Sequence, residues 1–191
     1  MDTNTIYRQV ERLSELLRVD LRLAGSSQNL QPVQIEVLHY LSMCNRYSDT
    51  PMSVTEYLGQ TKGTVSQTIK VLESKALIKK QVDEKDKRLL HLLITNKGRR
   101  VLEHCIPSPV FEQTCESFTA LKQVAIAEAL KQLLDAVQEN SQMKSFGVCH
   151  ECCHCVKSER LYCQFLEQPL TESDSEKICR LFKKDEAAGD L

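Results

Sequence analysis

The spacing of apolar positions predicts a largely helical first half of the chain. The stretch from Thr5 to about Leu23 repeats apolar side chains at helical spacing, and a second helix follows Pro32, where the first turn of a helix accepts proline. Two short helices come next, close together, with Ser53 and Thr61 as their expected N-caps and Gly59 in the turn between them. Two short helices joined by such a turn predict a helix-turn-helix.

The segment after these helices predicts a β-hairpin. Residues 77–82 and 89–95 show the alternation expected of strands, and six charged residues, 83–88, form the tip between them. A charged tip has nothing to bury, so it should project into solvent. A hairpin of this kind directly after a helix-turn-helix is a wing.

The second half of the chain returns to helical spacing. A helix is expected to start at Asn96 and to be interrupted by Pro107 and Pro109, and one long helix is expected from Val110 to about Glu139. The fold class predicted from these patterns is mainly α with a small β wing, that is, a winged helix-turn-helix domain flanked by further helices.

Charge is distributed unevenly, although the net charge of the 191 residues is only −1. Residues 53–104 contain eleven Lys and Arg against six Asp and Glu, whereas the segments on both sides are acidic. A basic block inside an otherwise acidic chain indicates a local face for a polyanion such as nucleic acid.

Several classes of protein are disfavoured by what the sequence lacks. No run of 18 apolar residues is present, so no membrane span is expected. The polar N-terminus shows no secretion signal, which makes a cytoplasmic location the expectation. Outside the last quarter of the chain there is no nucleophile–base pair, phosphate-binding loop or pair of acids, so we do not expect an enzyme.

Residues from about 30 to 105 resemble the MarR family of winged helix regulators, and residues 5–140 follow that family's order of helices and strands. The resemblance rests on motifs that occur in the family's order, namely LGQTKGTVSQ at 58–67, LESKALI at 72–78, Asp86-Lys87-Arg88, and LITNKG at 93–98. One position departs from the family pattern. Ala76 stands where the family usually has glycine, and a left-handed backbone there would be mildly strained with alanine.

The resemblance implies that the second short helix enters the major groove of double-stranded DNA. Short hydroxyl, amide and lysine side chains on that helix can bond base edges and phosphates. The residues expected to do so are Thr61, Lys62, Thr64, Ser66, Gln67 and Lys70. In the family the wing arginine reaches the minor groove, which implies that role for Arg88, with Asp86 steadying it and with Lys85 and Lys87 on phosphates.

The resemblance also implies a homodimer, because the family dimerises through its first and last helices. Two-fold symmetry then implies a palindromic operator. The chain divides on this basis into a first dimerisation helix (1–30), the winged helix-turn-helix domain (31–105), a last dimerisation helix (106–145) and a cysteine-rich tail (146–191). Many family members bind a small-molecule effector, but no convergent set of polar residues identifies one here.

Six of the nine cysteines lie between residues 149 and 179, which makes the tail a separate chemical unit. Cys149 and Cys152 have the two-residue gap of a metal knuckle, and Cys163 and Cys179 complete a set of four thiols. Four thiolates suit either Zn²⁺ or an iron–sulfur cluster, and in either case the bound metal would stabilise the small tail. The alternative ligands are Cys153, Cys155, His150 and His154.

Zinc, an iron–sulfur cluster and a metal-free thiol switch remain open for the tail. Zinc ribbons usually pair two knuckles, whereas Cys163 and Cys179 stand alone, a dispersed pattern that suits a cluster comparably well. The other three cysteines, Cys44, Cys105 and Cys115, lie on apolar helix faces and are expected to be buried packing residues.

These observations predict a sequence-specific DNA-binding regulator, a repressor by the family's commoner mode, that senses metal or redox state through its tail. The alternative is a metal-dependent protein-interaction module, or an electron-transfer protein, built on a winged helix. The operator, the regulated genes and the signal do not follow from the sequence.

Overall fold

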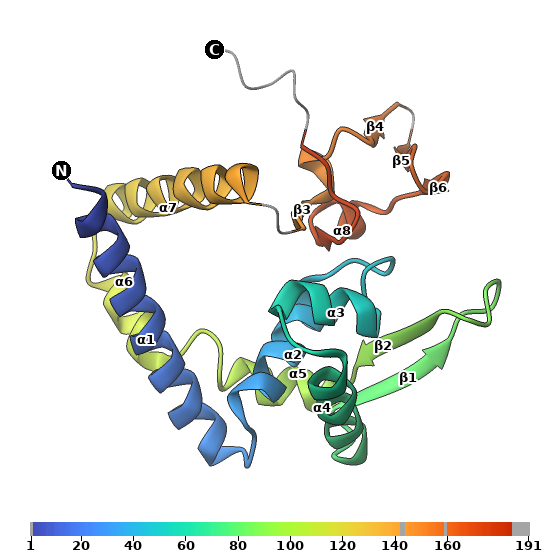
Figure 1. Ribbon diagram of the computed structural model, residues 1–191, viewed down its shortest axis with the longest axis horizontal. Helices are drawn as coiled ribbons and strands as arrows, with labels where there is room; N and C mark the ends of the chain where they lie inside the picture. Colours follow the sequence, from blue (N-terminus) through green and yellow to red (C-terminus); the bar gives the residue numbers. More distant parts are fainter. Residues whose placement is uncertain (1, 142–143, 159, 185–191) are drawn as a thin grey trace.

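The computed structural model describes residues 2–141, 144–158 and 160–184. The first nine elements form the helical body and the wing (Figure 1). In chain order they are α1 (Thr3–Ser27), α2 (Pro32–Met43), α3 (Pro51–Leu58), α4 (Lys62–Ser74), β1 (Ile78–Val82), β2 (Leu90–Ile94), α5 (Asn96–Glu103), α6 (Pro109–Glu116) and α7 (Ala120–Asn140).

The cysteine tail folds into small strands and turns. Its elements are β3 (Gly147–Val148), the 3-10 helix η1 (Cys149–Glu151), β4 (Cys155–Lys157), β5 (Leu161–Cys163), β6 (Gln168–Pro169), α8 (Glu172–Ser175) and β7 (Ile178–Cys179). β3 pairs antiparallel with β7, and β4, β5 and β6 form a second antiparallel sheet.

The ends of α3 and α4, the two helices of the helix-turn-helix, lie where local sequence signals predicted them, except for the N-cap of α3. Gly59 ends α3 with a left-handed backbone, φ +61°, and the Thr61 hydroxyl accepts the Thr64 N–H at the start of α4, as predicted. The prediction that Ser53 caps α3 was wrong. Thr50 is the cap, because its hydroxyl accepts the Ser53 N–H at 3.2 Å and Pro51 occupies the first helical position.

The predicted wing is confirmed as a two-stranded antiparallel hairpin. Ile78 pairs with Ile94 and Val82 with Leu90, so the first strand begins one residue later than predicted and the second strand is one residue shorter at both ends. The hairpin is held against α5 at Gly98, where an added Cβ would lie 2.2 Å from the Leu77 carbonyl oxygen. Glycine permits this close approach, and the wing is thereby attached firmly to the helical body.

The core of the winged domain is built around α2. Ile35, Val37, Leu38 and Tyr40 are completely buried there. They pack against apolar side chains from α3, α4, β1, β2 and α5, namely Val54, Val65, Ile69, Leu72, Ile78, Leu92 and Leu102. This cluster of long-range contacts is what positions α4 and the wing.

The single long helix predicted for residues 110–139 is instead two helices, α6 and α7. The break lies at Ser117–Thr119, where Thr119 adopts an extended backbone and its hydroxyl accepts the Lys122 N–H as the cap of α7. Threonine and serine side chains bond to nearby backbone groups and so compete with an uninterrupted helix. The spacing of apolar residues alone does not reveal that competition, so it predicted one uninterrupted helix.

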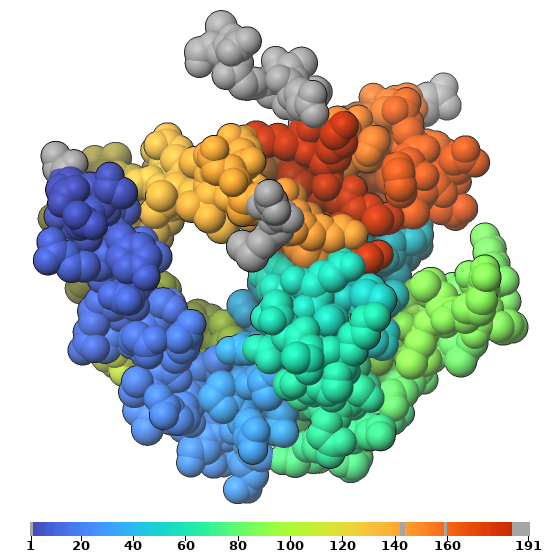
Figure 2. All heavy atoms as spheres, in the orientation of Figure 1, coloured from blue at the N-terminus to red at the C-terminus, as the bar shows by residue number. Residues whose placement is uncertain are grey.

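The helices α6 and α7 and most of α1 lie apart from the core of the winged domain, which α1 meets only near its C-terminal end, at Leu21 and Ala24. They follow one another around one side of the molecule in Figure 1, and Figure 2 shows an opening bounded by α1, α7 and α3. Gly25 is the sole buried residue of α1, and neither α6 nor α7 has a buried residue in the part of the chain described. Their apolar faces are therefore largely uncovered in the single chain.

The tail, in contrast, packs on the winged domain. Ile178 bridges to Cys44 and its carbonyl oxygen accepts the Asn45 N–H at 2.9 Å. Phe146 packs edge-on against the rings of Tyr40 and Tyr57, with centroids 6.3 and 5.1 Å away. The tail is thus joined to the turn between α2 and α3 and to α3 itself.

Candidate nucleic-acid interface and cysteine tail

All six residues predicted to contact DNA from the second short helix lie on the exposed face of α4 or at its cap. Val65, Thr68 and Ile69 point inward between them and attach the helix to the core. Thr61, Lys62, Thr64, Ser66, Gln67 and Lys70 are exposed. The Thr61 hydroxyl is committed to the helix cap and also lies 3.0 Å from the Thr64 hydroxyl, so its part in the face is to order the first turn.

A groove of about 300 Å³ separates α4 from the wing. Lys62, Ser66 and Lys70 line it from α4, and Lys80 lines it from β1, with its ammonium 2.6 Å from the Glu73 carboxylate. Sequence reasoning missed Lys80. Its only signal was a polar position on the outer face of the first wing strand.

The wing tip is ordered by two aspartates. One carboxylate oxygen of Asp83 accepts the N–H groups of Lys85 and Asp86 at 2.8 and 2.7 Å. Asp86 in turn accepts the backbone N–H and the guanidinium of Arg88, at 3.0, 3.1 and 3.3 Å. These bonds hold the pKa of Asp86 below its ordinary value. The Arg88 side chain is 92% exposed, so it is oriented at its base and open to a ligand at its end. Lys87 bends back, with its ammonium 3.3 Å from the Asp83 carbonyl oxygen.

Ala76 has the left-handed backbone that the sequence comparison suggested, with φ +56°. It follows the last residues of α4 and leads into β1. The exit from the recognition helix is therefore made with alanine in a conformation that favours glycine.

Three of the four predicted metal ligands accept N–H hydrogen bonds on sulfur. Asn45 Nδ2 donates to Cys149 Sγ at 3.2 Å, the Leu181 N–H to Cys179 Sγ at 3.3 Å, and the Lys183 N–H to Cys152 Sγ at 3.4 Å. A hydrogen bond from the Cys149 thiol, together with the Leu181 N–H, lowers the pKa of the Cys179 thiol below its ordinary value. The same pairing and burial raise the pKa of Cys149.

Cys163 lies in the same buried cluster as Cys149 and Cys179, and Cys155 packs against that cluster. Cys163 also lies opposite Cys155 in the strand pair β4–β5, whereas the ring of His154 packs on Phe165. His150 Nδ1 lies 3.2 Å from the Ser175 carbonyl oxygen, and the Cys153 N–H donates to the Lys183 carbonyl oxygen. Within residues 2–141, 144–158 and 160–184, no group of three or more His, Cys, Asp or Glu side chains is arranged to hold one metal ion.

The three cysteines outside the tail were all expected to be buried. Cys44 and Cys105 are buried in the core of the winged domain. Cys115 is only partly covered, because α6, on which it lies, is not packed on that core.

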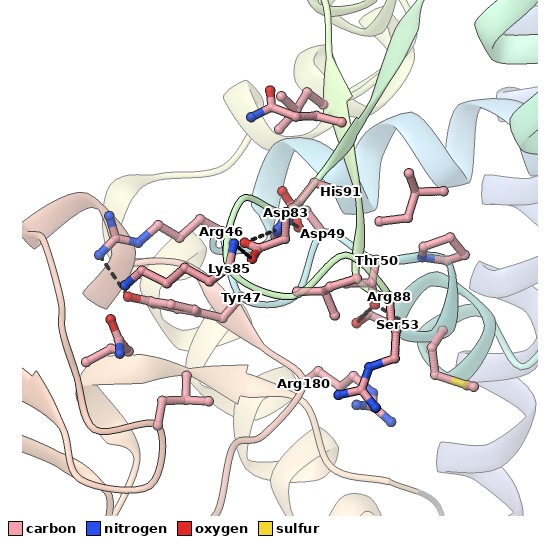
Figure 3. Close-up of a pocket in the computed structure, with 18 of the residues that line it drawn as sticks. Arg46, Tyr47, Asp49, Thr50, Ser53, Asp83, Lys85, Arg88, His91 and Arg180 are labelled. Atoms are coloured by element: carbon pink, nitrogen blue, oxygen red, sulfur yellow. Dashed lines mark hydrogen bonds and ion pairs between the residues drawn. The ribbon is translucent and has the colours of Figure 1, made fainter.

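A second, larger cleft of about 1060 Å³ lies between the wing and the tail (Figure 3). His91 of β2 lies in its wall, with Nδ1 2.5 Å from Asp49 and Nε2 3.2 Å from Asp83. Arg46 and Arg180 line the same cleft; Arg180 is bound by Glu56 through two bonds of 2.6 and 2.7 Å. None of these residues was singled out by sequence reasoning, because each acquires its partner from a distant segment.

Among the described residues, no helix has the length and apolar character needed to cross a membrane.

The chain is similar in sequence to known winged helix regulators. Residues 28–89 match the family model described as "MarR family". A protein of Bacillus subtilis (strain 168) named "Uncharacterized HTH-type transcriptional regulator YwaE" is 28% identical over 102 residues. That match spans 53% of this chain and 57% of the relative's length.

Solved structures share the fold at lower identity. A MarR transcriptional regulator from Methanosarcina mazei Go1 superposes with a TM-score of 0.62 at 20% identity, covering 73% of this chain and all of the other. Wild-type apo MarR from E. coli superposes with a TM-score of 0.54 at 18% identity, covering 70% and 98%. The Bacillus subtilis relative and the Methanosarcina mazei protein are both named as transcriptional regulators. The match to the MarR family model thus spans the helix-turn-helix and part of the wing, and the solved structures share the winged helix fold.

Proposed function

We propose that this chain is a sequence-specific DNA-binding transcriptional regulator that acts as a homodimer, with repression as its mode. The observation that carries the proposal is the exposed polar face of α4 beside the oriented wing arginine, Arg88. Hydroxyl, amide and lysine groups on α4 match the donors and acceptors of the major groove. An extended arginine suits a narrow minor groove, where negative potential is concentrated.

The lysines around this face support the same proposal. Lys62, Lys70 and Lys80 border the groove between α4 and the wing, and Lys85 lies at the wing tip. Cations in such an arrangement contact phosphates and release counterions, so affinity should fall steeply with salt. These lysines all belong to the basic block between residues 53 and 104.

The uncovered apolar faces of α1, α6 and α7 support a dimer. Leu13 and Leu17 of α1 and Leu130 and Leu134 of α7 are among the large apolar side chains left exposed in the single chain. Exposed apolar area of this extent marks an interaction surface. A second copy of the chain is the occupant we propose, and a two-fold dimer would read a palindromic operator.

The test starts from operators that the full-length protein selects out of a randomised duplex library. Affinity is then measured at one fixed salt concentration for the wild type, Arg88→Ala and, as a matched control, Arg100→Ala, which removes an exposed arginine on α5. We expect Arg88→Ala to weaken binding by about 1–3 kcal/mol and the control to leave it unchanged. Absence of selection for any sequence contradicts specific DNA binding, and equal affinity of Arg88→Ala removes that residue from the interface.

We further propose that the tail makes the regulator responsive to metal or redox state. The N–H groups directed at Cys149, Cys152 and Cys179 provide the kind of environment that stabilises thiolate ligands. With Cys163 they would hold Zn²⁺ or an iron–sulfur cluster, which would supply the tail with folding energy. The present positions do not converge on one centre, so binding a metal would have to draw these four sulfurs together.

Elemental analysis of untagged protein purified without oxygen tests the tail. Zinc at about one per chain without iron supports a structural zinc site, and iron with matching acid-labile sulfide supports a cluster. If neither is present and every thiol reacts with a thiol reagent in the denatured chain, metal binding is wrong. Operator affinity that is identical with and without the bound metal contradicts a sensing role.

A further inference from the structure

Strand β2 of the wing contains, near the tip, a histidine held between two carboxylates. His91 Nδ1 lies 2.5 Å from an Asp49 oxygen, and Nε2 lies 3.2 Å from an Asp83 oxygen. The His91 side chain is only 16% exposed, and the Asp49 carboxylate is buried. Figure 3 shows the three side chains close together in the wall of the cleft. Nothing in the proposed DNA interface uses this histidine directly.

Asp49 connects His91 to the helix-turn-helix. It lies in the turn between α2 and α3, immediately before Thr50, the cap of α3. The backbone of Asp49 is also joined to the wing, because its carbonyl oxygen accepts the Leu92 N–H at 2.7 Å. The wing strand β2 is therefore tied to the start of α3 by one backbone and one side-chain bond.

Asp83 connects His91 to the wing tip. The carboxylate oxygen that does not face His91 accepts the N–H groups of Lys85 and Asp86 and so shapes the turn. Asp86 then orients Arg88, the wing residue proposed to reach DNA. A short path of bonds thus runs from the turn before α3, through His91, to the base of Arg88.

The protonation state of His91 decides how many of these bonds can form. A neutral imidazole has one N–H, whereas imidazolium has two, and ionised carboxylates can only accept. Both contacts are therefore hydrogen bonds only when His91 is charged. The other charged groups lining this cleft are Arg46 from the α2–α3 turn, Glu84, Lys85 and Arg88 from the wing, and Arg180 from the tail, which Glu56 neutralises.

We propose that His91 is a positioning residue whose protonation holds the wing in place for DNA. The inference rests on the proposed function, because it concerns the same interface. In the protonated state His91 bonds Asp49 and Asp83 together, and the wing turn and Arg88 are held against the helix-turn-helix. Loss of the proton removes one of the two bonds and frees the wing tip from α3.

The direction of the expected pH dependence follows from the environment of His91. Burial alone lowers the pKa of His91, but hydrogen bonds and attraction from Asp49 and then Asp83 outweigh it, so the pKa is raised above 6.5. A raised pKa means that the brace is fully formed below pH 6.5 and is lost as the pH rises through the higher folded-state value. Operator affinity should therefore fall as the pH rises above neutrality.

Two measurements on the full-length protein test the proposal. The first is an NMR titration of the His91 ring and of the Lys85 and Asp86 amides, which should move together with a midpoint above 6.5. The second is operator affinity between pH 6.5 and 8.5 at constant ionic strength. We expect wild-type affinity to fall about three- to tenfold over this range, since one unit of linked pKa shift corresponds to a factor of ten.

Two variants separate positioning from a merely structural role. His91→Gln does not titrate and should bind with a nearly flat pH profile, at about the wild-type affinity of pH 8.5. Asp83→Asn keeps an oxygen for the Lys85 and Asp86 amides but loses the second carboxylate, so the pKa of His91 should fall and the pH slope should shrink. His104→Gln, which changes an exposed histidine, should retain the full wild-type profile.

The outcomes distinguish this inference from the proposed function. If His91→Gln weakens binding by the same factor at every pH, or if the His91 midpoint lies at or below 6.5, the inference is wrong while DNA binding stands. Should His91→Gln not fold, the Asp83→Asn profile decides, and an unchanged slope overturns the inference. A wild-type protein that selects no DNA at any pH contradicts the proposed function, and the joint titration of His91 with the wing amides then still tests the brace.

Discussion

At the residue scale, Ala76 is the point where the exit from α4 is most constrained. Its N–H donates to the Glu73 carbonyl oxygen at 2.8 Å, and its own carbonyl oxygen accepts the Thr95 hydroxyl at 2.9 Å. The backbone of Ala76 is left-handed, φ +56°, and in this conformation the Cβ of alanine crowds the neighbouring carbonyl. The hydrogen bonds of Ala76 to Glu73 and Thr95 keep it in this strained conformation.

Replacing Ala76 with glycine should therefore stabilise the protein. The left-handed conformation costs an L-residue about 1–2 kcal/mol, whereas glycine adds about 0.5–1 kcal/mol of backbone entropy, so Ala76→Gly should raise the free energy of unfolding by about 0.5–1 kcal/mol. Urea denaturation measures the change. Ala127→Gly, at an exposed position inside α7, is the matched control and should destabilise by about 1 kcal/mol. A loss of stability in Ala76→Gly would show that the left-handed backbone is not strained.

At the element scale, the turn between α2 and α3 joins three parts of the molecule. Its Asn45 bonds Cys149 and the backbone of Ile178 in the tail, and its Asp49 bonds His91 in the wing. Ser48 of the same turn contacts both α2 and the tail. Its carbonyl oxygen accepts the Tyr40 hydroxyl of α2, and its hydroxyl accepts the backbone N–H of Arg180 in the tail. A change in the tail is thereby placed within a few bonds of the wing.

The pair formed by Arg180 and Glu56 is a two-bond ionic link between the tail and the winged domain. Two charge-assisted hydrogen bonds at a half-buried site contribute about 1.5–3 kcal/mol, so Arg180→Ala should release the tail and leave the core of the winged domain folded. Hydrogen exchange of the tail amides measures the release. Arg18→Ala removes an exposed ion pair with Glu15 and serves as the control, with an effect below about 1 kcal/mol.

The same pair has a defined pH dependence. Hydrogen bonds from Arg180, which outweigh the effect of burial, lower the pKa of Glu56 below its ordinary value of 4.5. The free energy with which the Arg180–Glu56 pair holds the tail is therefore complete above pH 4.5. It is lost as the pH falls through the lower pKa that Glu56 has in the folded protein. Tail amides that exchange equally fast in wild type and in Arg180→Ala at neutral pH would contradict a docking role.

At the scale of the whole molecule, the division between a packed winged domain and uncovered outer helices is the dominant feature. Leu121 at the start of α7 is 84% exposed, and apolar side chains continue along α7 and α1. Among the described residues, the tail meets α7 through the ion pairs Lys131–Glu151 and Lys184–Glu139, and the large apolar side chains along α7 and α1 stay exposed. A second copy is the simplest source of the missing contacts.

The native mass should therefore be twice that of the 21.8 kDa chain. Leu13→Lys and Leu130→Lys place charges on the exposed apolar faces of α1 and α7 and should shift the protein towards monomer, as sedimentation equilibrium would measure. Val82→Lys alters an exposed apolar residue of the wing and should leave the mass unchanged. A wild-type protein that is monomeric at micromolar concentrations, or variants that dimerise as well as the wild type, would contradict the dimer.

Features set by neighbouring residues could be predicted from the chain. Gly59 ends α3 and Thr61 caps α4 because their effects reach only three or four residues, and the charged tip between the wing strands needs no partner to be recognised. The cap at Thr50 and the break before Thr119 were missed for a related reason. Several nearby hydroxyls can cap a helix, and the backbone geometry selects one of them.

Sequence by itself determined the order of helices and strands, the position of the basic block and the concentration of thiols in the tail, since these depend on local periodicity and composition. Tertiary structure decided that His91 meets Asp49, that Arg180 meets Glu56, and that Asn45 bonds Cys149. These partners lie 42, 124 and 104 residues apart in the chain. Contacts over such distances form only when the core around α2 brings the segments together, because no local propensity can specify which distant charge or thiol a side chain will meet.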